Sequence, residues 1–170
     1  MATLDPSEVW REWCVDIVEV LNLWFEIELG THMLLATILK TKTQLAIALL
    51  SSVAGPKAQR DIILNCASCA YAREPDVKKI ETILRRLSIA ARRRNLLVHG
   101  LLSFHPSYPY QLAVTNRHAN ADPALIAYEI ITKQEMKRIK NQFSSLRADI
   151  HGLIGHLKKA KRQPLRGTRP

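Results

Sequence analysis

The chain has few cysteines and no apolar run long enough to cross a bilayer. Three cysteines occur in 170 residues, and the first residues lack the basic-then-apolar pattern of a secretory signal. The most apolar region, residues 32–54, is interrupted by Lys40 and Lys42, so no stretch of about 18 uncharged apolar residues exists. These absences predict a soluble, cytoplasmic protein that does not act in a membrane.

The sequence also lacks a recognisable set of metal ligands. Cys66 and Cys69 form a single C-x-x-C, whereas a closed tetrahedral site needs four ligands and no second cysteine pair is present. We interpret both thiols as small core residues. We therefore expect neither a bound metal nor a cofactor.

Acidic residues are scarce relative to basic ones. The chain carries 25 Lys and Arg against 15 Asp and Glu, a net charge of +10, which favours a polyanionic partner. The acids gather in residues 1–30, which hold a single base, Arg11, whereas the last 13 residues hold six bases and no acid. Length and composition fit one globular domain over residues 1–157, followed by a flexible basic tail over 158–170.

Capping residues and apolar periodicity predict a mainly α fold, a bundle of about five helices. The expected helices cover residues 5–30, 31–54, 56–72, 75–99 and 132–157. Gly30 is predicted to end the first helix in a left-handed turn, and Thr31 to cap the second. The three tryptophans of the first helix are expected in the core. Two short strands, 108–115 and 124–130, predict a small β-hairpin between the fourth and fifth helices.

One arginine of the fourth helix occupies an unexpected position. On a helical wheel with Ile80 at zero, Arg94 falls at about 320°, inside the apolar stripe, whereas Arg92 and Arg93 fall on the polar side. The stripe consists of Ile80, Ile83, Leu84, Leu87, Ala90, Ala91 and Val98. An inward guanidinium is costly unless an anion or several carbonyls satisfy it.

Two explanations of the inward Arg94 are open. The first is a structural ion pair, for which the acidic first helix supplies Asp16, Glu19 and Glu26. The second is a cleft in which Arg94 binds a phosphate with both arms of its guanidinium. Asn95 and His99, four residues apart, lie at the edge of the same face, so three polar groups converge there.

Arg94-Asn95, followed after three residues by His99, resembles the Arg-x4–6-His motif of the HEPN family (higher eukaryote and prokaryote nucleotide-binding domains). A polar residue commonly follows the arginine in that motif, as Asn95 does here. Arg92 and Arg93 also satisfy the permitted spacing, but the wheel and Asn95 both select Arg94. The resemblance extends in outline over residues 5–157, because HEPN domains are helical bundles with the motif late in a long helix.

The resemblance implies a metal-independent RNA endonuclease of toxin or defence type, a homodimer whose two motifs share a cleft. A partner antitoxin, such as a minimal nucleotidyltransferase, restrains many such proteins. His99 would then be the acid/base and Arg94 the phosphate clamp, with Asn95 orienting either the histidine or the phosphate. The further RNA contacts that we expect come from Arg85, Arg92, Arg93, Lys158 and Lys159.

Other interpretations remain open. His99, followed by Gly100, also fits a histidine that only interacts with the last carbonyls of its helix. His105 and His118 lie in later loops, and nothing in the sequence assigns them a role. The chain as a whole also fits a non-catalytic HEPN-like module that binds nucleic acid, a nucleotide or a protein. A third possibility is an inert subunit whose basic tail docks on an acidic partner.

Overall fold

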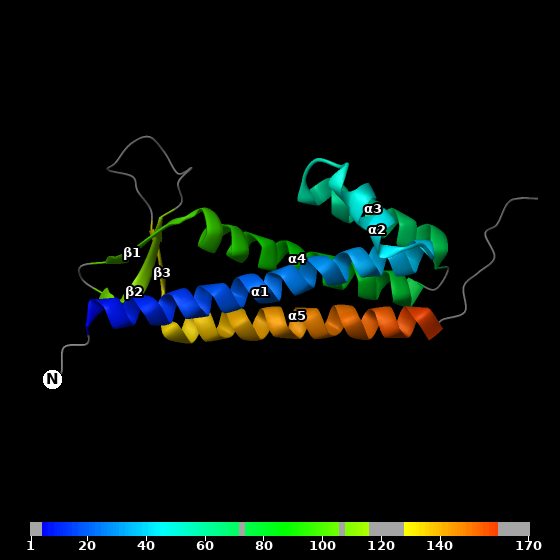
Figure 1. Cartoon of the computed structure of the whole chain (residues 1–170). Coiled ribbons are helices and arrows are strands. Elements are labelled where there is room, and N and C mark those ends of the chain that lie inside the picture. Colours follow the sequence, from blue (N-terminus) through cyan, green and yellow to red (C-terminus); the bar gives the residue numbers. More distant parts are fainter. Residues whose placement is uncertain (1–4, 72–73, 106–107, 116–127, 160–170) are drawn as a thin grey trace, which may run out of the picture. The chain divides into compact units, whose positions relative to one another are not determined.

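The computed structural model describes residues 5–71, 74–105, 108–115 and 128–159, and these form five helices and three strands (Figure 1). The elements are α1 (Pro6–Leu39), α2 (Thr43–Ser51), α3 (Pro56–Ala70), α4 (Glu74–His99), β1 (Leu101–His105), β2 (Tyr108–Thr115), β3 (Tyr128–Ile131) and α5 (Lys133–Lys159). The mainly helical fold with a small β element between the fourth and fifth helices, expected from the sequence, is confirmed.

The described residues divide into two compact units. The unit that we call the sheet unit takes Met1–Trp24 and Ile89–Ser144, and the helical unit takes Phe25–Ser88 and Ser145–Pro170. Helices α1, α4 and α5 therefore each contribute residues to both units. Lys158 and Lys159 end α5, and the predicted tail beyond them, residues 160–170, lies outside the described residues.

The sheet unit is built around an antiparallel sheet of order β1-β2-β3. Leu102 pairs with Val114 in the first ladder, and Val114 pairs with Glu129 in the second. Its core side chains come from the strands, α1, α4 and α5, and include Trp13, Val20, Leu97, Leu112, Val114, Ile131, Met136, Ile139 and Phe143. The strand β1 was not predicted, so the expected two-stranded hairpin is in fact a three-stranded sheet. The predicted strand start at 124–127 lies outside the described residues.

Helices α1 and α5 run in the same direction within the sheet unit. Lys133 lies 3.4 Å from a carboxylate oxygen of Glu12, and Lys140 lies 2.8 Å from one of Glu19, so both partners advance by seven residues. Asp16 accepts hydrogen bonds of 2.9 Å from both lysines. The acids of the first helix, which the sequence offered as partners for Arg94, are thus occupied by lysines of α5.

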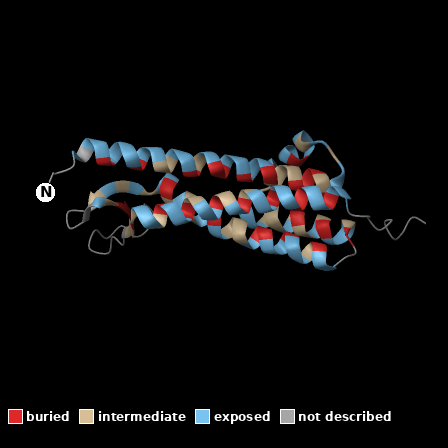
Figure 2. Ribbon diagram, turned by 90° about the horizontal axis from the view of Figure 1, so that it is seen from below, coloured by how far each residue is buried: buried red, intermediate tan, exposed pale blue. Residues whose placement is uncertain are grey.

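The helical unit has an apolar core to which all five helices contribute. Figure 2 colours the buried parts of the ribbon red. The buried residues of this unit include Ile27, Leu34, Leu35, Ile38, Leu50, Ile63, Ile80, Leu84, Ile150, Leu153 and Leu157. Arg147 on α5 donates a 2.6 Å hydrogen bond to Glu26 on α1, the third acid proposed as a partner for Arg94. The third, fourth and fifth helices lie within two residues of their predicted bounds.

The prediction that the first helix ends at Gly30 is wrong, because α1 continues to Leu39. Gly30 is a contact point rather than a turn: a Cβ there would lie 3.0 Å from Cγ2 of Ile150. Thr31 does not cap a helix, since its hydroxyl donates to the carbonyl of Ile27 within the same helix. The left-handed residue that follows α1 is Lys40, with φ of 54°, and the second helix begins only at Thr43.

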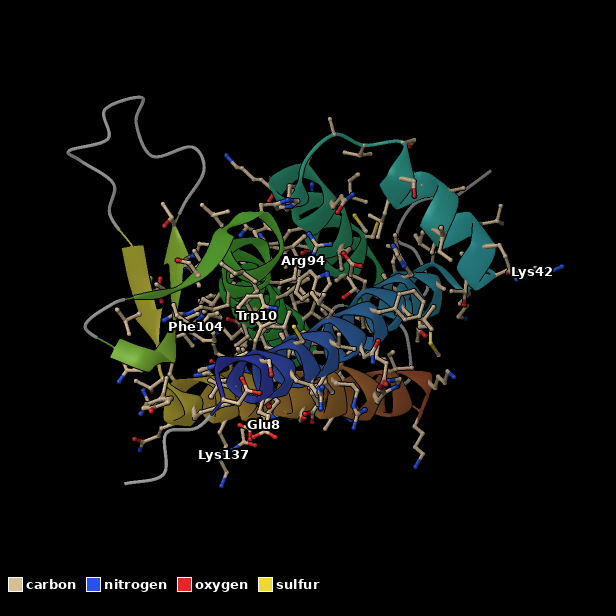
Figure 3. The ribbon with its side chains drawn as sticks, turned by 60° about the vertical axis from the view of Figure 1, so that its left-hand side comes forward. Glu8, Trp10, Lys42, Arg94, Phe104 and Lys137 are labelled. Atoms are coloured by element: carbon tan, nitrogen blue, oxygen red, sulfur yellow. The ribbon has the colours of Figure 1, made fainter. Side chains whose placement is uncertain are left out.

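Two predicted core residues lie at the surface instead. Trp13 and Trp24 are buried, but Trp10 is 37% exposed and places its ring against the edge of Phe104 on β1, at 5.4 Å between centroids (Figure 3). On α3, Cys66 is half-buried and Cys69 is exposed, so the interpretation of Cys69 as a core residue is wrong. The buried line of α3 runs through Ile63 and Ala67, to one side of Cys69.

Candidate functional site

The predicted motif lies in the last three turns of α4, within the sheet unit. The buried line of this helix segment runs through Ala90 and Leu97, and Arg94 lies between them in sequence and on the same side. Val98, expected in the stripe, is 39% exposed, so Leu97 takes the place assigned to Val98. The inward position predicted for Arg94 is therefore consistent with its half-buried environment.

The guanidinium of Arg94 is only partly satisfied. Its Nε is fully enclosed and has no hydrogen-bond partner, while Nη1 donates a 3.1 Å bond to the side-chain oxygen of Asn95. No carboxylate of the described residues pairs with Arg94, and the three acids proposed from the sequence pair with α5 instead. The structural ion-pair explanation thus fails for these acids. A buried arginine nitrogen without a partner is costly, and because Nε is enclosed, an anion would have to bind the guanidinium through its Nη atoms.

Asn95 and His99 are exposed beside Arg94, one turn apart on α4. Asn95 holds the Nη1 end of Arg94, and His99 is the last residue of the helix. The next residue, Gly100, donates its backbone N–H to the carbonyl of Leu96 at 3.0 Å. The three motif residues are therefore close together, with two side chains open to solvent.

Close packing fixes the end of α4, and with it the backbone of His99. A Cβ on Gly100 would lie 2.3 Å from Cγ1 of Val114 and 2.5 Å from the carbonyl oxygen of Leu96. Only glycine allows the chain to pass from α4 directly into β1 at this distance from β2. Gly100 is required by this approach and not by a left-handed turn, since its φ is not positive.

The predicted accessory cations differ in availability. Arg93 is taken up by Glu129 of β3 and by Glu135 of α5, the latter at 3.3 Å. Arg92 is exposed, and no described residue forms an ion pair with it. Arg85 belongs to the helical unit, where it lines a shallow pocket of about 450 Å³, and Lys158 and Lys159 are exposed at the end of α5. The side chain of His105 and the whole of His118 lie outside the part of the chain that the structure describes.

Sequence reasoning missed a groove in the helical unit, of about 610 Å³, between α4 and α5. Its walls carry Lys78, Lys79, Thr82, Arg86, Asp149 and His156. Asp76, the one buried charged residue among those described, lies 2.8 Å from Nε2 of His156. Arg86 forms an ion pair with Asp149 and donates a 3.1 Å hydrogen bond to the hydroxyl of Ser145. The i, i+1 and i+8 spacing of Lys78, Lys79 and Arg86 could have indicated one basic face of α4.

In the described part of the chain, no three histidine, cysteine or acidic side chains come close enough to hold a metal ion. No single described helix is long and apolar enough to span a membrane; α1 and α2, bent by 109° at the break between them, pass that test only as a pair. Comparison with family models, curated proteins and solved structures found no match for this chain.

Proposed function

We propose that the chain is a metal-independent RNA endonuclease of the HEPN type, with Arg94, Asn95 and His99 as its catalytic residues. One observation carries the proposal: Arg94 lies on the side of α4 that buries Ala90 and Leu97, its Nε is enclosed without a partner, and no described carboxylate pairs with it. A structural arginine would be satisfied by its own chain. An arginine that its own chain leaves partly unsatisfied still has its Nη atoms to offer to a phosphate.

The three side chains suit cleavage of RNA through its own 2′-hydroxyl. The hydroxyl attacks the adjacent phosphorus, the bond to the 5′-oxygen of the next nucleotide breaks, and a 2′,3′-cyclic phosphate forms. His99 is exposed and would take the proton of the 2′-hydroxyl and deliver a proton to the departing 5′-oxygen, because an imidazole both accepts and donates protons. Arg94 stabilises the charge that develops on the phosphoryl oxygens, and Asn95 holds the arginine in place through its 3.1 Å bond.

The proposal includes a homodimer and an RNA ligand, and an antitoxin such as a minimal nucleotidyltransferase as a possible protein partner. One Arg and one His make a sparse site, and a two-fold axis would double the groups available. Arg85, Arg92, Lys158 and Lys159 are exposed and available for phosphate contacts. Arg93 would contribute only after leaving Glu129 and Glu135.

The test is cleavage of single-stranded RNA in EDTA by the purified chain, with analysis of the product ends. We expect cyclic phosphate ends, and loss of cleavage in His99→Ala and Arg94→Ala with the fold retained. His151→Ala and Arg138→Ala are matched controls, since both side chains are exposed and lie outside the catalytic trio and outside the expected RNA contacts. Cleavage that survives His99→Ala refutes the assignment, as does a well-folded wild type that cuts no RNA.

The α4–α5 groove favours a second candidate, a non-catalytic module that binds a phosphorylated ligand. Three cations line a volume suited to a small molecule: Arg86 pairs with Asp149 and Lys78 with Glu74, whereas no described carboxylate pairs with Lys79. Binding of ADP measured by calorimetry tests it. Binding that Lys79→Glu abolishes and His99→Ala leaves unchanged, in a chain without ribonuclease activity, would favour this candidate over the first.

A further inference from the structure

Helix α1 exposes a row of side chains on the side opposite its buried face, and four of the five are apolar. Val15, Val18 and Phe25 are 62%, 54% and 67% exposed, and Asn22 and Leu29 are exposed as well. Their spacings are three, four, three and four residues. We call these five residues the α1 seam.

The spacing of the α1 seam is that of a coiled coil. Residues that alternate by three and four along one helix form a straight seam that packs against a second helix by knobs into holes. The seam lies on one continuous helix, α1, whose opposite side buries Trp13, Val20 and Ile27. A row of exposed apolar residues this long, with Phe25 the most exposed of them, is typical of an interface.

Asn22 is the one polar residue of the α1 seam and stands at its centre. It takes an a position of the heptad, with Val15 and Leu29 one heptad away on either side. A side-chain amide both donates and accepts hydrogen bonds, so an identical amide opposite it satisfies it. A single asparagine at an a position fixes the register of a coiled coil in this way. The α1 seam therefore fits a partner helix that has an asparagine opposite Asn22.

The charges beside the seam also permit a second copy of the same helix. On one flank, Glu12, Glu19 and Glu26 each pair with a basic residue of α5 at the same seven-residue interval. These basic residues are Lys133, Lys140 and Arg147, and the two lysines also pair with Asp16. The ion pairs therefore reduce the repulsion between this flank and another acidic helix.

We propose that the α1 seam binds the α1 seam of a second copy of this chain, in parallel orientation and in register. Each seam residue then meets its own counterpart, so the two Asn22 amides bond to each other and the two Phe25 rings pack together. An antiparallel copy would instead bury each Asn22 amide against Val18 or, in the other register, against Phe25, in both cases without a partner, which is costly. Ion pairs between Arg11 of one copy and Glu28 of the other would partly offset this cost, but such exposed ion pairs contribute little to stability. This inference rests on the dimer of the proposed function and names its surface.

Sedimentation velocity of the full chain without RNA tests the seam. We expect a wild-type dimer, and an increase in Kd of at least about 100-fold for Val18→Glu. Ile89→Glu, at an apolar side chain of α4 that is 47% exposed and outside the seam, is the matched control and should leave the Kd unchanged. A monomeric wild type, or equal weakening by the control, overturns the proposal.

Disulfide cross-linking tests the orientation. In a chain whose three native cysteines are replaced by serine, Leu29→Cys should give a covalent dimer on mild oxidation, because only the parallel pair brings the two positions together. The antiparallel pair places them at opposite ends of the seam. Ile89→Cys is the matched control and should stay monomeric on a non-reducing gel. Absence of the Leu29→Cys cross-link in a chain that still dimerises overturns the parallel register.

The outcomes for the seam and for the ribonuclease are separable. A dimer that survives Val18→Glu overturns the seam and leaves the ribonuclease standing. A dimer that depends on the seam but cuts no RNA removes only the ribonuclease.

Discussion

Arg94→Met should make the fold more stable, which is unusual for replacement of a half-buried side chain. Methionine keeps the unbranched apolar stem and removes the guanidinium whose Nε is enclosed without a partner. Relief of one unsatisfied buried group contributes about 1–3 kcal/mol, and loss of the solvent-exposed bond to Asn95 costs about 0.5–1 kcal/mol. The expected net gain in the free energy of unfolding is about 1 kcal/mol, which raises Tm by about 2–4 °C.

Arg93→Met is the matched control, one residue away on the same helix. It removes ion pairs to Glu129 and Glu135, whose partly exposed geometry makes each worth about 0.5–1 kcal/mol. We expect the free energy of unfolding, measured by urea denaturation at pH 7, to fall for Arg93→Met and to rise for Arg94→Met. A fall for Arg94→Met equal to that of the control would show that Arg94 is structural and would refute the reasoning. RNA cleavage should be lost in Arg94→Met although the fold is more stable.

Three further predictions concern stability and are measured by denaturation. Gly100→Ala should lower the free energy of unfolding by about 2 kcal/mol or more, because the new Cβ would clash with Val114. Gly152→Ala is the control: Gly152 has open space around it, so the substitution should raise the free energy of unfolding by about 0.5–1 kcal/mol. Equal effects of the two substitutions would contradict this account. Partial burial acts to raise the pKa of Asp16, but Lys133 and Lys140 of α5 lower it below its usual value. The ionised Asp16 therefore stabilises the fold above about pH 4, and this contribution is lost as the pH falls through the lowered pKa. Asp16→Asn should make the free energy of unfolding depend less on pH in that acidic range. Thr132→Ala should cost about 1 kcal/mol, because the hydroxyl caps α5, and an unchanged stability would rule out the cap.

The elements that the sequence predicted well are those with local signals. The fifth helix starts where its capping residue, Thr132, accepts the backbone N–H of Glu135, and the third starts at Pro56. The position of Arg94 on the same side of α4 as the buried Ala90 and Leu97 also follows from helical periodicity alone. Each of these features depends on residues within a few positions of one another.

The errors arise where a distant segment decides the outcome. Gly30 carries the local signature of a helix end, but its missing side chain serves contact with Ile150, more than a hundred residues away. The strand β1 has only five residues and is stabilised by pairing with β2. The carboxylates of Glu129 and Glu135 that occupy Arg93 come from β3 and α5, and no local pattern indicates them.

The sheet unit is assembled from two stretches of chain, Met1–Trp24 and Ile89–Ser144, with roughly 60 residues between them. A ribosome adds about 5 to 20 residues per second, so some 3 to 12 s pass between synthesis of the first stretch and the start of the second. During that delay Trp13 has neither the strands nor α5 to cover it. The motif at Arg94 and His99 therefore takes its final form only after the whole of the second stretch has left the exit tunnel.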